Sequence, residues 1–281
     1  MYICRRYQHI FLMQFSKWNK YNRGFEYGTV EYWFKAIKLT LNADKSNFVV
    51  FRSKCKKITD IPNLIQFGNT SISRNNSIKY LGVILDEYLT WEEHITDVCN
   101  KLKRYYKVFY CIRKYVNTEQ IKNIYYALIY SRIKYAIPVF GFTSSNKLDR
   151  LQTLQNKLLK VLLARNYRFS TNLLHNELEI LKVKDIAKMD ALTFVFNYLG
   201  NNLPRVFNNY FILKNDFHNI NIRGADTQIQ VDRWKKDIGH TSVKIMGATL
   251  WNQTKNSIKE SKNIKLFRSK IENDILPYQI N

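Results

Sequence analysis

The spacing of hydrophobic residues divides the chain into a strand-rich first part and a helical remainder. Over residues 30–41 hydrophobic side chains recur at the spacing of one helix face, and the turn-rich residues 42–47 end this predicted helix. The tetrapeptide FVVF (residues 48–51) follows and predicts a buried strand. The sequence LIQFGNTSI contains two short runs around Gly68-Asn69, a dipeptide suited to a tight hairpin turn.

The next segment, SIKYLGVILD, predicts one further strand with Gly82 in its interior. Glycine weakens the interior of a strand, so it usually marks a bulge or a place where another backbone passes close by. After Asp86 the pattern becomes helical. Thr90 and Glu93 have the spacing of a capping box, in which the hydroxyl and the carboxylate each accept a hydrogen bond from a backbone amide near the helix start.

Three long helices are predicted after this cap. The first, which extends to about Tyr115, has a stripe of Ile95, Val98, Leu102, Tyr106 and Phe109. The second, capped by Thr118, carries Ile121, Ile124, Tyr125 and Leu128. Pro138 and Gly141 break the chain before the third, which carries Leu148, Leu151, Leu154, Leu158 and Leu162. Shorter helices are predicted past Thr171, LGNNLP (residues 199–204) is a predicted boundary, and the polar tail cannot be assigned. The predicted fold class is α+β and mostly helical.

Basic residues are concentrated on the predicted helices. The 281-residue chain has a net charge of +23, and residues 101–168 hold fifteen Lys and Arg residues against only Glu119 and Asp149. Such an excess is typical of proteins that bind polyanions, nucleic acid first and an anionic membrane surface second. The candidate contact residues are Lys101, Lys103, Arg104, Tyr105, Lys107, Arg113 and Lys114, which would bind phosphates nonspecifically, with rings available for stacking. The alternatives are a solvated outer face and a charge that only reflects A/T-rich codons.

The remaining composition favours an intracellular protein, nuclear or cytoplasmic and not secreted. Cys4, Cys55, Cys99 and Cys111 form no C-x-x-C pair, so they predict neither a zinc site nor a disulfide framework. The longest early hydrophobic run, residues 10–13, is far shorter than the roughly 20 residues of a membrane span, so no membrane partner is expected. The first residues lack the small-residue cleavage site of a targeting peptide.

The order of three motifs resembles the reverse transcriptases of non-LTR (LINE-type) retrotransposons, from the end of the palm through the thumb and beyond. The motifs are WFKAIKLTLNADKSNFVVFRSK, SIKYLGVILDEYLTWEEHI and YALIYSRIKYAIPVFG, and weaker similarity continues in NIRGAD and SVKIMGATLWN. The resemblance implies an uncertain lead-in at 1–29 and a partial palm with a small antiparallel sheet or hairpin at 30–89. It further implies a basic helical thumb with connected helices at 90–204 and a C-terminal region at 205–281.

The same resemblance implies roles for single residues. Lys45 corresponds to a palm lysine that lies near the leaving pyrophosphate and can act as a general acid, although a solvated turn lysine is the alternative. Tyr80, Leu81 and Gly82 correspond to the primer-grip hairpin, where the backbone approaches the primer end; an ordinary bulge is the alternative. The basic helices over residues 90–165 would track the product duplex of primer and template.

The sequence departs from the family at the catalytic centre. Two adjacent aspartates, which hold the metal ions of nucleotidyl transfer, are implied about thirty residues before Trp33. That position falls near residues 2–6, which contain no carboxylate, and no aspartate occurs before Asp44. Other acids are poor substitutes. In the cluster of Asp86, Glu87, Glu92, Glu93 and Asp97, Glu92 and Glu93 fit a helix start, and Asp185 and Asp190 are five residues apart and flanked by lysines.

The expectation is therefore a truncated polymerase that binds RNA and DNA but is inactive alone, with Mg²⁺ needed only by the intact enzyme. The alternatives are a non-catalytic RNA- or DNA-binding module and a helical scaffold whose charge reflects codon bias.

Overall fold

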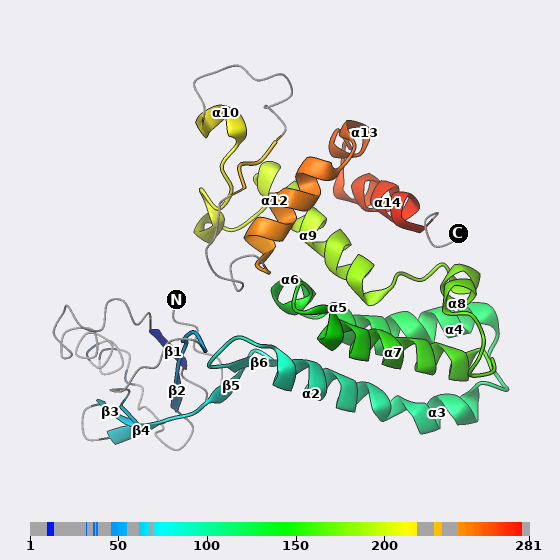
Figure 1. Cartoon of the computed structure of the whole chain (residues 1–281), viewed down its shortest axis with the longest axis horizontal. Coiled ribbons are helices and arrows are strands. Elements are labelled where there is room, and N and C mark those ends of the chain that lie inside the picture. The colour runs from blue at the N-terminus through cyan, green and yellow to red at the C-terminus, as the bar shows by residue number, and fades with distance from the viewer. Residues whose placement is uncertain are drawn as a thin grey trace. The chain divides into compact units, whose positions relative to one another are not determined.

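The chain divides into two compact units, Met1–His94 and Ile95–Asn281. A computed structural model describes residues 10–13, 32, 36, 38, 46–54, 62–67, 70–217, 228–231 and 241–276. The predicted helix over residues 30–41 lies almost wholly outside these residues, as do Lys45 and residues 2–6. Over the described residues the α+β, mostly helical class is confirmed, with a small sheet and hairpin followed by helices (Figure 1).

The first unit is built on a small sheet in the order β1-β2-β4-β3. Its strands are β1 (Ile10–Met13), β2 (Asn47–Val50), β3 (Leu64–Phe67) and β4 (Thr70–Arg74). The predicted FVVF strand is confirmed as β2, whose Phe48, Val49 and Val50 are buried because the strand has a neighbour on each side. β2 pairs in parallel with β1 and β4, whereas β3 and β4 are antiparallel. Phe67 pairs with Thr70, so the hairpin predicted around Gly68-Asn69 is also confirmed.

The prediction of a single strand over SIKYLGVILD is wrong. Two antiparallel strands, β5 (Ser77–Tyr80) and β6 (Val83–Asp86), form a hairpin in which Tyr80 pairs with Val83. Leu81 and Gly82 are its two-residue turn, with φ of 46° and 86°. Two successive positive φ angles are what a hairpin turn twisted like its strands requires, and glycine adopts them without strain. Gly82 is therefore explained by the turn rather than by a bulge inside a strand.

The second unit is helical, and its first half runs from α2 to α7. The helices are α2 (Glu92–Lys103, which begins in the first unit), α3 (Tyr105–Ile112), α4 (Thr118–Ile124), the π-helix η3 (Tyr125–Tyr130), α5 (Ser131–Lys134), α6 (Ile137–Phe140) and α7 (Ser145–Leu162). The leucine stripe predicted for the third helix is confirmed, because all five of its leucines are buried in α7. In the first stripe, Tyr106 is 51% exposed, so its placement in the core is wrong.

The second predicted helix differs from its prediction in two respects. Its N-cap is Asn117, which forms a capping box with Gln120, so Thr118 is the first helical residue and not the cap. The π-helix then changes the register of the buried face. A π-helix has more than four residues per turn, so Ile121, Tyr125, Ile129 and Ile133 are buried at a spacing of four and Leu128 is not fully buried.

The second half of this unit wraps around one long helix. The elements are α8 (Thr171–Leu178), α9 (Val183–Leu199), the 3₁₀ turn η4 (Arg205–Phe207), α10 (Lys214–Phe217), α12 (Val243–Gln253), α13 (Asn256–Lys259) and α14 (Ile264–Ile275). α9 has 17 residues, so the prediction that helices past Thr171 are shorter is wrong for it. LGNNLP ends α9, but α12 and α14 pack back against α9 within the same unit.

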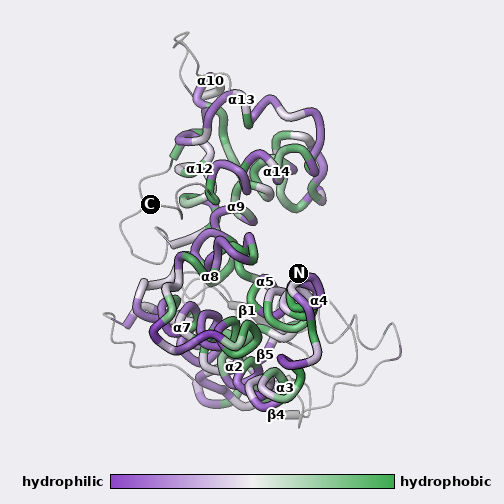
Figure 2. Tube along the Cα trace, turned by 90° about the vertical axis from the view of Figure 1, so that its right-hand side faces the viewer, coloured by the Kyte–Doolittle hydropathy of each residue, from purple (hydrophilic) through white to green (hydrophobic). Residues whose placement is uncertain are grey.

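Hydrophobic and hydrophilic residues alternate along the helices of this unit (Figure 2). The buried face of each helix contributes to one core, whose largest fully buried side chains include Phe109, Tyr125, Phe140, Leu151 and Phe267. No helix within the described parts of the chain is long and apolar enough to cross a membrane.

Candidate nucleic-acid interface

Partly buried ionic contacts join Arg52, which follows β2, and Arg74 of β4 to Glu87, which follows β6. Arg52 Nε and Nη2 donate to the two Glu87 carboxylate oxygens at 2.9 and 3.1 Å, and Arg74 Nη2 donates to Oε2 at 2.8 Å. Burial favours the neutral form of Glu87, but the hydrogen bonds with Arg52, Tyr88 and Arg74 and the positive charge of Arg52 together outweigh it and lower the pKa of the carboxyl group. Glu87 is therefore a charged structural partner of two arginines.

Asp86 organises the turn that leads from the hairpin into α2. Its carboxylate accepts hydrogen bonds from the amides of Tyr88, Thr90 and Trp91 at 3.1, 2.9 and 3.0 Å. The amide of Thr90, which the predicted capping box would pair with Glu93, thus donates to Asp86 instead. The box is replaced because the turn is built around the Asp86 carboxylate.

The other acid pair also has structural partners. Asp185 accepts from Lys188 at 3.1 Å, and Asp190 lies 3.7 Å from both Lys134 and Arg268. Burial raises the pKa of Asp190, and the two nearby cations act against that shift. Among the residues that the structure describes, no group of three His, Cys, Asp or Glu side chains is placed to hold a metal ion.

The basic residues predicted on the first helix are divided between two of its sides. Arg104 has helical dihedral angles, so α2 and α3 form an almost continuous helix (Figure 1). Lys103 and Lys107 are exposed four residues apart on one side, and Lys114 is exposed in the turn that follows α3. Lys101 and Arg104 lie on other sides, and Lys101 forms an ion pair with Asp97.

Tyr105 belongs to a different contact from the one predicted. Its hydroxyl accepts a hydrogen bond from Arg132 Nε at 2.9 Å, and the Arg132 guanidinium lies 5.6 Å from the ring centroid. Its ring also stacks on the buried Phe109. This tyrosine therefore joins α3 to α5. Arg113, by contrast, lies over the exposed ring of Tyr110, at 4.0 Å from its centroid.

The primer-grip candidates lie in the first unit. Leu81 is 59% exposed at the tip of the hairpin, Gly82 is exposed beside it, and Tyr80 is partly exposed. The predicted basic contact residues of α2 and α3 lie in the second unit.

Two cationic residues of α7 were missed by sequence reasoning. Arg150 and Lys157 are exposed and lie seven residues apart, away from the leucine stripe. That spacing on the polar face of a predicted helix was the available signal. It could not show that this face of α7 lines a groove together with α2.

Comparison with known proteins yields three curated relatives, all RNA-directed DNA polymerases of mobile elements. A probable RNA-directed DNA polymerase from transposon X-element of Drosophila melanogaster is 26% identical over 156 residues, which are 54% of this chain and 17% of the relative. The jockey polymerase of Drosophila funebris is 27% identical over 156 residues, again 54% and 17%. The jockey polymerase of Drosophila melanogaster is 22% identical over 178 residues, or 62% and 19%.

The chain is homologous to non-LTR retrotransposon reverse transcriptases. This homology confirms the resemblance on which the motifs were interpreted. The matched region covers about half of the chain and less than a fifth of each relative's length. No family model matches the chain, and no solved structure matches it significantly.

Proposed function

We propose that this chain is the nucleic-acid-holding part of a non-LTR-type RNA-directed DNA polymerase, contacting a primer–template duplex of RNA and DNA through its phosphates. The observation that carries the proposal is the exposure of Lys103 and Lys107 on one side of α2 and α3, and of Lys114 in the turn after α3, in a chain whose curated relatives are polymerases of this kind. Ammonium groups along a helix bind phosphates without reading sequence, because the contacts reach only the backbone.

The hairpin tip at Leu81-Gly82 is the second contact of this proposal. A two-residue turn gives the backbone close access to a ligand, because glycine carries no side chain there. In this proposal the primer end would lie at this turn, with Tyr80 beside it, as the resemblance implies. Lys45 is the general acid of the intact enzyme in the same scheme.

We further propose that the chain alone does not catalyse nucleotidyl transfer and binds no metal cofactor. Residues 2–6, where the resemblance implies the paired aspartates, contain no carboxylate. The absence of a metal site is also supported by the structural partners of Asp86, Glu87 and Asp190. Mg²⁺ would be a requirement of the intact polymerase, and the setting of this activity would be the nucleus or cytoplasm.

Salt-dependent binding tests the duplex contact. The binding constant for an RNA–DNA duplex should fall steeply as the salt concentration rises. On logarithmic axes, each phosphate contacted should contribute about −0.9 to the slope. The double variant Lys107→Gln/Lys114→Gln should weaken binding and lower the slope by about 2. Lys262→Gln/Lys265→Gln, which removes two exposed lysines elsewhere in the same unit, is the matched control and should leave both unchanged.

A flat salt dependence would support the scaffold alternative and contradict duplex binding. Primer extension with Mg²⁺ tests the second claim. Extension by this chain alone, abolished by chelation of the metal, would overturn the proposal that it lacks catalytic power.

A further inference from the structure

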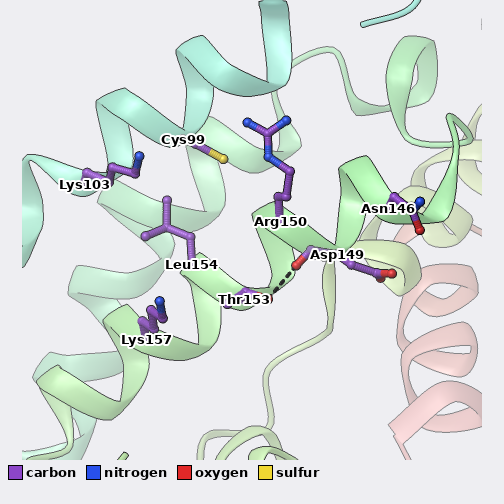
Figure 3. A pocket seen from close by; sticks show the side chains of 8 residues that line it. All are labelled: Cys99, Lys103, Asn146, Asp149, Arg150, Thr153, Leu154 and Lys157. Atoms are coloured by element: carbon purple, nitrogen blue, oxygen red, sulfur yellow. Dashed lines mark hydrogen bonds between the residues drawn. The ribbon is translucent and has the colours of Figure 1, made fainter. Parts of the chain in front are cut away.

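A groove lined by charged, polar and apolar residues lies between α2 and α7, on the side of α2 that carries Lys103 (Figure 3). Its volume is about 500 Å³. Its lining residues are Cys99 and Lys103 from α2 and Asn146, Asp149, Arg150, Thr153, Leu154 and Lys157 from α7. A volume of this size suits a small ligand or one strand of a polymer, but not a duplex.

The charge of the groove is positive. Lys103, Arg150 and Lys157 contribute three cations, whereas Asp149 is the one acid in the lining and pairs with Lys184 at 2.8 Å. Among the described residues no carboxylate lies within ion-pair distance of Lys103 or Lys157, and Lys103 Nζ makes only a long contact of 3.4 Å with Asn100. The two lysines therefore have the capacity to bind an anionic ligand.

The groove has an ordered, partly apolar base. Leu154 is 9% and Cys99 6% exposed, so both are packed against the core. Arg150 Nη2 donates to Thr96 Oγ1 at 3.2 Å, which ties this guanidinium to the first half of α2. Arg150 and Lys157 are separated by two turns of α7, roughly 10 Å along the helix axis.

Two exposed aromatic rings continue the line of the groove along α3. Tyr106 and Tyr110 follow Lys103 at spacings of three and seven residues, so they share its side of the almost continuous helix. They are 51% and 54% exposed, and the guanidinium of Arg113 lies over the Tyr110 ring. A cationic groove followed by solvent-facing rings is the arrangement with which proteins bind unpaired strands, because every base has a face that can stack.

We infer that the α2–α7 groove binds the phosphates of a single unpaired nucleic-acid strand, whose bases stack on Tyr106 and Tyr110. This inference rests on the proposed function and adds to it a second substrate form, bound at a groove that shares Lys103 with the duplex contact. An unpaired strand adjoins the duplex in any primer–template, so the two sites would act on neighbouring parts of one ligand.

The test compares a labelled single strand of about 12 nucleotides with a hairpin duplex by fluorescence anisotropy. The groove variant is Lys103→Gln/Arg150→Gln/Lys157→Gln. Its matched control is Arg205→Gln/Lys262→Gln/Lys265→Gln, which removes the same number of Lys and Arg residues from exposed positions of the same unit. The groove variant should bind the single strand at least tenfold more weakly, and its logarithmic salt slope should fall by about 2. The control should bind as the wild type does.

Tyr106→Leu and Tyr110→Leu supply a second, charge-neutral readout. Each should weaken single-strand binding about tenfold while leaving the salt slope unchanged, because stacking releases no counterions. Circular dichroism of every variant should match that of the wild type, since all five positions are solvent-facing.

The outcomes separate the inference from the function on which it rests. If the wild type binds neither ligand, both fail. If it binds the duplex but the groove variant keeps wild-type affinity for the single strand, only the inference is overturned. Equal losses in the groove variant and its control would also overturn it. The inference would also be overturned if phosphatidylserine vesicles displaced the labelled strand and unlabelled strand did not. The groove would then be a membrane contact.

Discussion

The helices α7 and α9 are nearly the same length, 18 and 17 residues, yet they have different relations to solvent. The exposed residues of α7 are Ser145, Asn146, Asp149, Arg150, Thr153 and Lys157. All but Ser145 line the groove with α2. In α9, only Lys184 and Lys188 are exposed. The polar face of α7 is thus available to a ligand, whereas most of the surface of α9 is packed against other helices.

Their neighbours explain the difference. α9 packs against α5, α6, α7, α12 and α14, so apolar residues are needed around most of its circumference. α7 packs on α3, α8 and α9 and leaves one face in solvent. A helix with a single hydrophobic stripe can carry function on its other face, whereas a helix surrounded by partners serves the core.

A buried charge should reveal this contrast most strongly. Ala191→Lys places an ammonium group at a fully buried position of α9, and we expect a loss of more than about 4 kcal/mol in the free energy of unfolding. Thr153→Lys, at an exposed position of α7, should change stability by less than about 0.5 kcal/mol. Urea denaturation measures both. Equal tolerance of the two lysines would show that α9 is less enclosed than the structure indicates.

Truncation of core side chains should affect the two helices equally. Leu158 in α7 and Ile186 in α9 are both fully buried. Changing either to alanine should lower the free energy of unfolding by about 2–5 kcal/mol, because a cavity remains where the side chain was. The control is Lys157→Ala. Lys157 is adjacent to Leu158 in the sequence but lies on the exposed face of α7. A comparable loss in this control would contradict the assignment of two distinct faces to α7.

A smaller effect is expected where α6 meets α9. A Cβ on Gly141 would lie 2.7 Å from the Ala187 Cβ and 2.6 Å from the Ile137 carbonyl oxygen. Gly141→Ala should therefore cost about 1–3 kcal/mol through overpacking. Ala187→Gly in the same chain removes one of the three contacts shorter than 3.0 Å, so a double variant should recover part of the loss in thermal denaturation. Full stability of Gly141→Ala would mean that α6 is not held so close to α9.

The smallest effect concerns pH at the junction of α7 with α8. His175 is fully buried; its Nδ1 contacts the Ile180 carbonyl oxygen at 2.9 Å and its Nε2 lies 2.8 Å from Asn156 Oδ1 of α7. Burial lowers the pKa of the imidazole. The unfolded chain then binds the proton more readily, so stability is complete above the unfolded pKa of about 6.5 and is lost as the pH falls below it.

The measurement is chemical denaturation between pH 5 and pH 8. The difference in slope between the wild type and His175→Gln isolates the contribution of this histidine from those of other groups. Identical slopes would show that His175 takes up its proton equally well in the folded and unfolded chains.

Much of the fold followed from local pattern. The leucine stripe of α7, the buried FVVF strand and the hairpin at Gly68-Asn69 were predicted because each depends on spacing or turn chemistry within one short segment. The predictions failed where distant contacts decide. Tyr106 has a stripe position but is exposed, and the π-helix after Ile124 moves the buried face away from Leu128.

The candidate site was predicted in the same uneven way. The basic side of α2 and α3 was visible in the sequence, since charge and spacing are local properties. The pairing of Tyr105 with Arg132 joins positions 27 residues apart, and the groove joins positions about 50 apart. Contacts of that kind leave no periodic signal in either segment.

By itself, the sequence determined the mostly helical class, the excess of positive charge and the motifs shared with polymerases of mobile elements, because these are properties of composition and local order. The tertiary structure decided which charges remain available to a ligand. It assigned Asp86 and Glu87 to structural roles and enclosed α9 with five other helices. It also brought Lys103 of α2 to the same groove as Arg150 and Lys157 of α7. The physical reason is that burial and pairing depend on which faces meet, and only packing determines that.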